Sequence, residues 1–203
     1  MKRILALVTV VFLMTASLPL SAGADGGLSF ASIFGDGMVL QQGRPVQVFG
    51  FGRDGDTVTV TLKKGDEAVA SQTAAVSGGR WNAALPAQSG SFDEYSLEAK
   101  AGSVVRTVEN LVFGEVWIAG GQSNMEWTLA KAAEAADWAK KEHTGKVRFF
   151  VSVDSGSDTP QDDAAGYWLT AVSWDAAQLC SAIGYMFAYN LSDTLGIPVG
   201  IVN

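Results

Sequence analysis

The sequence predicts an α/β protein in which an antiparallel β-sandwich precedes a parallel sheet wound by helices. From residue 28 to residue 111, short runs of alternating apolar and polar residues are separated by Gly, Asp and Ser, without a helical period. From residue 113 the pattern changes to strand, helix, strand, helix, strand, which is typical of a parallel sheet. We therefore expect a β-sandwich domain over residues 25–112 and an α/β domain over residues 113–203.

The amino-terminal segment has the features of a secretory signal peptide. A basic start, residues 1–3, precedes an apolar run over residues 4–14. Small residues up to Ala24 then occupy the cleavage positions. A membrane anchor would need about twenty apolar residues, and Thr15 interrupts the run too early. We expect a signal peptide over residues 1–24, export to the periplasm or the exterior, and no stable membrane anchor.

The charge and the cysteine content exclude some classes of partner. The formal net charge is −7, and it becomes −9 when the signal peptide is removed, because Lys2 and Arg3 leave with no acidic residue. An acidic chain without a basic cluster argues against nucleic-acid binding, since phosphates need Lys and Arg to neutralise them. Cys180 is the single cysteine, so it cannot form an internal disulfide, and its apolar helical context favours a buried structural thiol.

The first domain is built from short strands and tight turns. Three alternating runs are predicted strands: residues 46–50, 57–62 and 95–100. Gly78 and Gly79, and later Gly102, are hairpin-type turn signals. Trp81 follows the first of these turns, and a core position is favoured over a sugar-stacking role.

The second domain alternates buried strands with helices. Predicted strands cover residues 112–119, 147–153 and 199–202, and predicted helices cover residues 128–142 and 178–195. The second helix is expected to turn four apolar side chains to the core: Ile183, Met186, Phe187 and Leu191. With only about three strands, one edge of the parallel sheet is expected to be unpaired.

Residues 154–163 form a polar, acidic segment between these elements. They could offer oxygen ligands to calcium, but they fit no EF-hand spacing, so a solvated loop bordering the site is favoured and no metal is predicted. Trp127 and Trp168 could line an acyl or sugar pocket, although both are equally suited to the core.

The chain is organised around residues 120–126, Gly-Gly-Gln-Ser-Asn-Met-Glu. A strand that breaks at two glycines and restarts as a helix places Ser123 at a helix N-terminus, where free N–H groups can stabilise the oxyanion that a nucleophilic serine generates. Ser123 and Glu126 also have the spacing of a capping box, a purely structural alternative. Met125 stands where a G-x-S-x-G elbow needs Gly, which disfavours an ordinary α/β-hydrolase. The spacing alone leaves the two roles open.

Residues 113–126, FGEVWIAGGQSNME, resemble the first sequence block of sialate O-acetylesterase-like proteins, which are SGNH hydrolases. Residues 34–41, residues 181–187 and residues 196–203 resemble further parts of that family. The resemblance implies a flavodoxin-like SGNH domain in which Ser123 is the catalytic nucleophile. It also implies that Gly121, Gln122 and Asn124 form the oxyanion and substrate-binding positions, that the substrate is an O-acetylated carbohydrate, and that no cofactor is used.

The same resemblance implies that catalytic parts are missing from this chain. In the family, an oxyanion-hole Gly and Asn and an Asp-x-x-His pair lie downstream of the point where this chain stops. His143 is the single histidine, and Lys140 stands where the Asp of such a pair would be, so we expect His143 to stabilise a helix end with Gly145 as its cap. We therefore expect an incomplete SGNH domain over residues 113–203, inactive alone.

Two functional hypotheses follow from the sequence. The first is a serine esterase that removes O-acetyl groups from sialate or another sugar. The second is an exported, non-catalytic carbohydrate-binding or interaction module. The hypothesis of a phosphate-binding glycine loop has weak support, because neither G-x-G-x-x-G nor a Walker lysine is present.

Overall fold

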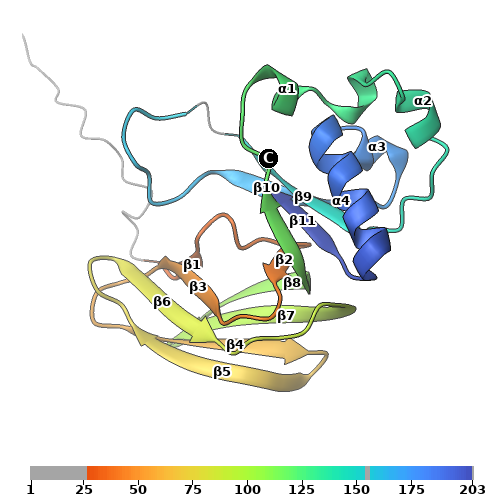
Figure 1. The fold of residues 1–203 in the computed structure, drawn as a ribbon. Coiled ribbons are helices and arrows are strands. Elements are labelled where there is room, and N and C mark those ends of the chain that lie inside the picture. The colour runs from red at the N-terminus through yellow and green to blue at the C-terminus, as the bar shows by residue number, and fades with distance from the viewer. Residues whose placement is uncertain (1–26, 154–155, 203) are drawn as a thin grey trace, which may run out of the picture.

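The computed structural model describes residues 27–153 and 156–202, so the predicted signal peptide over residues 1–24 lies outside the described residues (Figure 1). The chain is a mixed α/β structure rich in sheet, as predicted. The strands of the first half are β1 (Ser29–Phe30), β2 (Val39–Gln41), β3 (Val46–Phe51), β4 (Thr57–Lys64), β5 (Glu67–Ala75), β6 (Arg80–Leu85), β7 (Ser91–Ala101) and β8 (Val104–Ile118). Between residues 27 and 122, all of them described, no helix forms.

Helices and strands alternate along the second half of the chain, which is drawn above the first half in Figure 1. It contains α1 (Ser123–Glu126), the 3-10 turn η1 (Leu129–Lys131), α2 (Ala135–Trp138), β9 (Val147–Ser152), β10 (Gly166–Thr170), α3 (Trp174–Ala177), α4 (Ala182–Leu195) and β11 (Val199–Val202). β11 pairs in parallel with both β8 and β9, whereas β10 adds an antiparallel edge to β9. β10 was not predicted from the sequence.

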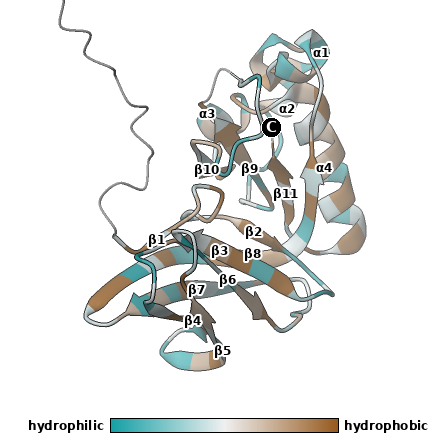
Figure 2. Cartoon of the chain, turned by 90° about the vertical axis from the view of Figure 1, so that its left-hand side faces the viewer, coloured by the Kyte–Doolittle hydropathy of each residue, from teal (hydrophilic) through white to brown (hydrophobic). Residues whose placement is uncertain are grey.

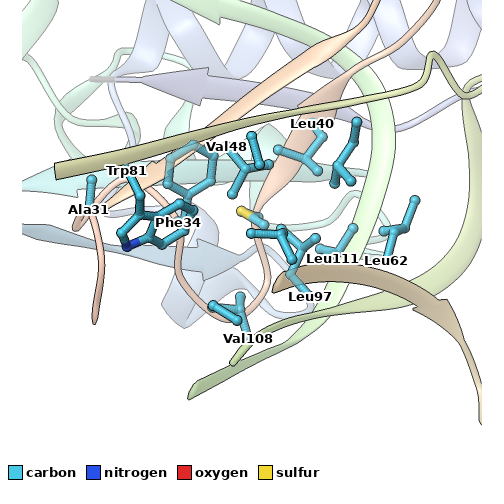
Figure 3. Packing of buried hydrophobic residues seen from close by; sticks show 14 of the residues in the cluster. Ala31, Phe34, Leu40, Val48, Leu62, Trp81, Leu97, Val108 and Leu111 are labelled. Atoms are coloured by element: carbon cyan, nitrogen blue, oxygen red, sulfur yellow. The ribbon is translucent and has the colours of Figure 1, made fainter. Parts of the chain in front are cut away.

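Two antiparallel layers enclose the core of the first half. One layer has the strand order β1-β3-β6, and the other contains β5, β4, β7 and the first part of β8. Hydrophobic and hydrophilic residues alternate along these strands, as Figure 2 shows. Val48 and Trp81 from the first layer meet Leu62, Leu97 and Leu111 from the second (Figure 3). Trp81 is buried, and its indole N–H donates to the Phe51 carbonyl, which confirms its predicted core position.

The predicted turns have the backbone that their glycines allow. Gly78 and Gly79 both have positive φ, 62° and 77°, between the bridged residues Ser77 and Arg80. This is the conformation of a two-residue hairpin turn whose twist matches the flanking strands.

One strand, β8, belongs to both halves. Its first part pairs with β7, residues 112–114 pair with β2, and residues 115–118 pair with β11. The boundary expected between residues 112 and 113 therefore falls inside a single 15-residue strand.

Polar contacts fasten the two halves around this strand. The buried Arg148 of β9 donates to the carbonyls of Gly37 and Asn110. The Trp168 indole N–H donates to the Ile33 carbonyl at 2.7 Å. Trp168 is therefore a core residue at the junction and does not line a pocket beside Ser123.

The continuous helix expected over residues 128–142 is wrong. Thr128 and Ala132 have extended backbone, and only η1 and α2 form. The physical reason is tertiary: Leu129 and Ala130 donate backbone hydrogen bonds to Cys180 and Gln178, which fixes this segment against the chain before α4. These contacts override the high helix propensity of Ala and Lys.

The helix expected over residues 178–195 begins later, and its predicted buried face is partly wrong. α3 and α4 are separate, and Ser181 caps α4 by accepting from the Gly184 N–H. The buried side chains of α4 include Tyr185, Ala188 and Tyr189, whereas Ile183 and Phe187 are exposed. Because α4 is apolar on most of its surface, the apolar spacing did not distinguish the face that meets the sheet.

Candidate active site

Ser123 follows the carboxyl end of β8, at the edge where parallel strands of an α/β sheet place their sites (Figure 1). The Ala119 N–H donates to the Val202 carbonyl at 2.8 Å, which holds the end of β8 beside β11. The chain then leaves the sheet through Gly120 and Gly121 and forms the single turn of α1. Strand, glycine break and helical turn thus occur in the predicted order.

The Ser123 hydroxyl does not cap this turn, so the capping-box interpretation is wrong. Gln122 occupies the N-cap position, and no side chain makes a capping hydrogen bond. The Gln122 carbonyl accepts from the N–H groups of both Met125 and Glu126. Ser123 is already the first helical residue, and its exposed side chain makes no hydrogen bond within residues 27–153 and 156–202.

The other predicted site residues are close to Ser123 through the backbone. Gly121, Gln122 and Asn124 are all exposed on the same turn. The N–H groups of Ser123 and Asn124 lie in the first turn of α1, where no residue of the helix can accept from them. The structure therefore brings these four residues together and leaves backbone donors available for an anion.

Ser181 supports this turn, and sequence reasoning missed it. The buried Ser181 hydroxyl lies 3.3 Å from the Met125 Sδ and also accepts from the Gly184 N–H. The Ala182 N–H donates to the Trp127 carbonyl at 2.8 Å. The sequence signal was a serine directly before an apolar helical run, which is the pattern of an N-cap.

An apolar hollow of about 230 Å³ lies next to the turn. It is lined by Trp117, Ile118, Ala119, Met125, Ile183, Gly184, Phe187 and Ile201. Trp127, four residues after Ser123, is half exposed and donates its indole N–H to the Lys131 carbonyl. Of the two tryptophans considered for a pocket, only Trp127 lies on the surface near Ser123.

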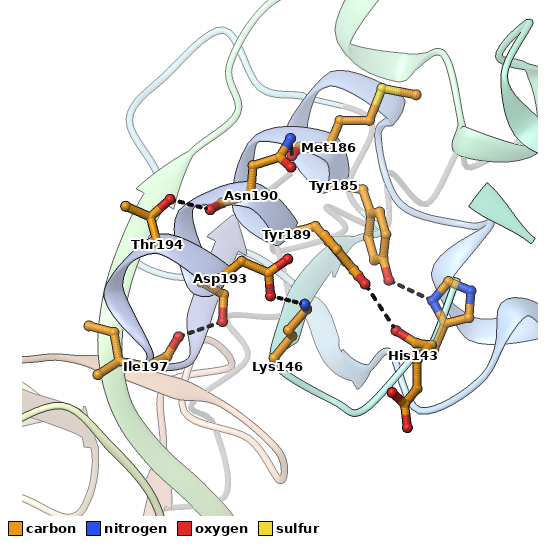
Figure 4. Close-up of polar contacts among 11 residues, drawn as sticks. His143, Lys146, Tyr185, Met186, Tyr189, Asn190, Asp193, Thr194 and Ile197 are labelled. Carbon is orange, nitrogen blue, oxygen red and sulfur yellow. Dashed lines mark hydrogen bonds and ion pairs between the residues drawn. The ribbon is translucent and has the colours of Figure 1, made fainter. Parts of the chain in front are cut away.

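The imidazole of His143 is engaged with α4. Its Nδ1 lies 2.7 Å from the Tyr185 hydroxyl on α4, and its Nε2 is buried with no hydrogen-bond partner among residues 27–153 and 156–202 (Figure 4). Burial lowers the pKa of His143 below its ordinary value, against a smaller opposing effect of the Trp138 carbonyl. The imidazole is therefore part of the packing around α4. The helix end expected at His143, with Gly145 as its cap, is wrong, because α2 already ends at Trp138 and the Gly145 N–H donates to the Ala171 carbonyl.

The acidic segment is attached to the first half of the molecule. Both carboxylate oxygens of Asp163 accept from the Ser32 N–H, and Oδ2 also accepts from its hydroxyl. Asp162 forms an ion pair with Arg80. Across the two described ranges, no group of three or more His, Cys, Asp or Glu side chains is placed to hold a metal ion. Nor does any helix in the described part of the chain have the length and apolarity to cross a membrane.

A second hollow of about 380 Å³ opens on the β-sheet half. Phe49, Arg80, Asn82 and Asp162 are among the residues that line it. The partly exposed ring of Phe49 beside polar side chains is a combination that suits a sugar, which offers both an apolar face and hydroxyl groups.

Comparison with known proteins gives this geometry a family context. No family model matches the chain. The chain is 32% identical to the sialate O-acetylesterase of Mus musculus over 211 residues, which cover 96% of this chain and 38% of that protein. It is 29% identical to the Homo sapiens sialate O-acetylesterase, over 91% of this chain and 39% of that protein.

The structural comparison agrees. A crystal structure of a novel carbohydrate acetylesterase from Xanthomonas citri matches with a TM-score of 0.77 and 31% identity, over 86% of this chain and 39% of that one. The chain thus spans about two fifths of the length of its relatives. The resemblance predicted from residues 113–126 is confirmed: over about nine tenths of its length, the chain is similar to sialate O-acetylesterases.

Proposed function

We propose that the chain carries the nucleophile of a serine esterase that removes O-acetyl groups from carbohydrates. This proposal rests on the hydroxyl of Ser123, which follows the carboxyl end of β8, is exposed and does not cap α1. The relatives of the chain are esterases. Residues 27–112 would form the β-sandwich unit, residues 113–202 would form part of an SGNH hydrolase domain, and the protein would be exported.

In the proposed reaction, Ser123 Oγ attacks the acetyl carbonyl while a general base accepts its proton. The N–H groups of Ser123 and Asn124 donate to the oxyanion of the tetrahedral intermediate, with Gly121 giving the substrate close access to the backbone. The sugar hydroxyl leaves with a proton, and water then hydrolyses the acetyl-enzyme to acetate. Because His143 is held by Tyr185, the base is proposed to come from polypeptide outside these 203 residues.

The test compares the 203-residue chain with a chimera in which the unmatched remainder of the Mus musculus relative is joined after it. Acetate release from O-acetylated sialic acid and from acetylated xylan is measured for both. We expect the chimera to release acetate and the 203-residue chain to release none. In the chimera, Ser123→Ala should lower kcat at least about 1,000-fold. Ser103→Ala, an exposed serine in the β7–β8 turn, is the matched control and should retain full activity. Retained turnover in Ser123→Ala would overturn the proposal.

A second candidate function is carbohydrate binding at the Phe49 hollow, without hydrolysis there. It is favoured by the partly exposed Phe49 ring beside Arg80 and Asn82. Phe49→Ala should weaken glycan binding by the 203-residue chain about fivefold, since stacking on an aromatic ring contributes of the order of 1 kcal/mol. Val105→Ala, an equally exposed apolar position on β8, should leave it unchanged. Equal binding by the two variants would exclude this site.

A further inference from the structure

The outer face of the β1-β3-β6 layer presents an aromatic ring beside polar groups. Arg80 and Asn82 lie two residues apart on β6, and Trp81 between them is buried in the core, so the two polar side chains point to the outer face. Phe49 of β3 lies directly opposite Asn82 in the antiparallel register and is also exposed. Phe49, Arg80 and Asn82 all line the hollow of about 380 Å³. The register therefore gathers a ring, an amide and a guanidinium on one surface.

The ring of Phe49 is held in place by its packing. It contacts the ring of the buried Phe34 edge to face, with centroids 5.1 Å apart, while 36% of Phe49 stays exposed. A side chain that is already ordered loses little conformational freedom when a ligand stacks on it. The hollow thus offers a fixed apolar surface to a sugar ring before any ligand is bound.

The two charged side chains that line this hollow, Arg80 and Asp162, form an ion pair with each other. The Arg80 side chain is 49% exposed and that of Asp162 is 65% exposed. An ion pair this accessible to water stabilises a protein little, because solvent and salt screen the attraction. Another carboxylate that reaches Arg80 can therefore replace Asp162 at low cost.

The acidic segment stays attached when Asp162 is released. The next residue, Asp163, accepts from the N–H and from the hydroxyl of Ser32, at 2.8 Å in each case. These bonds fix the backbone one position beyond Asp162 and do not involve Arg80. Asp162 is therefore an exposed carboxylate on an anchored segment, and it occupies the guanidinium of Arg80 without being needed to hold the segment in place.

We propose that the hollow binds a sugar that carries a carboxylate, and that this carboxylate replaces Asp162 at Arg80. The planar guanidinium can donate two parallel hydrogen bonds to the ligand carboxylate. The sugar ring then stacks on Phe49, and the Asn82 amide exchanges hydrogen bonds with its hydroxyl groups. The proposal rests on the second candidate function, carbohydrate binding at this hollow. It adds the charge of the ligand and the residue that competes with it.

The test compares two sugars that differ only in one group, methyl β-D-glucuronide with a carboxylate and methyl β-D-glucoside with a hydroxymethyl group in its place. Their dissociation constants for the 203-residue chain are measured by NMR titration, with the Trp81 indole and the Asn82 amide as reporters. We expect the glucuronide to bind at least about fivefold more tightly. The methyl glycoside of N-acetylneuraminate is a second acidic probe, and the tighter of the two acidic sugars identifies the ligand as a uronate or a sialate.

Single substitutions assign the charged groups. Asp162→Asn removes the competing carboxylate and should tighten binding of the glucuronide about threefold, while binding of the glucoside stays unchanged. Arg80→Gln should abolish the preference for the glucuronide. Arg106→Gln, at an exposed arginine of β8, is the matched control for Arg80. Asp93→Asn, which breaks the exposed ion pair with Lys64, is the matched control for Asp162. Neither control should change the preference.

The remaining outcomes overturn the proposal in distinguishable ways. Equal affinity for the glucuronide and the glucoside, lost in Phe49→Ala, would leave the carbohydrate site standing and exclude an acidic ligand. No saturable signal with any of the sugars would exclude the carbohydrate site as well. A preference that survives Arg80→Gln, or an Asp162→Asn variant that binds the glucuronide no more tightly, would exclude the exchange of carboxylates at Arg80. Acetate release is not measured, so the esterase proposal is tested separately.

Discussion

The guanidinium of Arg148 on β9 donates from Nη2 to the side-chain oxygen of Asn110 on β8 at 3.2 Å. Its Nη1 donates to the Gly37 carbonyl at 3.1 Å and also to the Asn110 carbonyl. Asn110 has a φ of 55°, a conformation that few residues other than Gly, Asn and Asp adopt readily. One buried cation thus joins the parallel sheet to two segments of the β-sheet half, and burial lowers the pKa of its guanidinium.

Replacing Arg148 with alanine should destabilise the protein strongly. The change would leave the buried carbonyl of Gly37 without its donor, at a cost of about 1–3 kcal/mol, and would also remove the contacts with the exposed Asn110. We expect the free energy of unfolding in urea to fall by about 2–4 kcal/mol. Arg106→Ala, at an exposed position of β8, should change it by less than about 0.5 kcal/mol. Similar losses in the two variants would contradict a joining role for Arg148.

His143 should make stability depend on pH below neutrality. Its pKa is lowered by burial in the folded state, so the unfolded chain binds the proton more readily. The contribution of neutral His143 is therefore fully present above about pH 6.5, the ordinary value, and is lost as the pH falls from there toward the folded-state pKa. Urea unfolding of the wild type and of His143→Gln between pH 7.5 and pH 5 would measure it. A variant with an unchanged pH slope would show that another group is responsible.

Cys180 should be inert in the folded protein. The thiol is fully buried, and burial raises its pKa to about 12, so almost no thiolate forms at neutral pH. We expect a chromogenic disulfide reagent to leave the native chain unmodified for hours and to modify one thiol per chain within minutes in 6 M guanidinium chloride. Rapid modification of the native protein would mean that the segment around Cys180 opens readily.

Ser181→Ala should loosen the turn that presents Ser123. Losing the α4 N-cap should cost about 1 kcal/mol, and the hydroxyl contact with Met125 disappears at the same time. Ser173→Ala is a matched control, because Ser173 caps α3 in the same way and makes no hydrogen bond to α1. Amide hydrogen exchange should accelerate at Met125 and Glu126 in Ser181→Ala and stay unchanged there in Ser173→Ala. Equal exchange in both variants would remove Ser181 from the support of the site.

Ile118→Asp should reduce self-association of the 203-residue chain. Ile118 is 81% exposed at the end of β8, next to the exposed Trp117, and a charge there disfavours edge-to-edge pairing and shrinks the exposed apolar patch. We expect the sedimentation coefficient at high protein concentration to shift toward that of the monomer. Val172→Asp, at a position that is 64% exposed but does not line the hollow with Ile118, should not produce the shift.

Much of this architecture could be predicted because local chemistry decided it. The alternation in β3, β4 and β7 and the positive φ at Gly78, Gly79 and Gly102 follow from short-range patterns, and so does the position of Ser123 after β8. The errors arose where distant contacts decide. η1 exists because Leu129 bonds to Cys180, some 50 positions along the chain, and β10 is a strand because Phe150 and Trp168 pack together across the β9 pair. The sequence of residues 128–142 alone does not indicate the hydrogen bond between Leu129 and Cys180.

The continuity of β8 also determines how the molecule can move. A 15-residue strand extends over about 50 Å and has no loop between its two ends. A hinge needs a few residues that can change their backbone angles freely. The residues of β8 are held by strand pairing or, at Glu109 and Asn110, by hydrogen bonds to Asp36, Gly37 and Arg148. We therefore expect the two halves to turn together. Any closing motion around Ser123 is left to the short segment from Gly120 to Trp127, which lies outside both sheets.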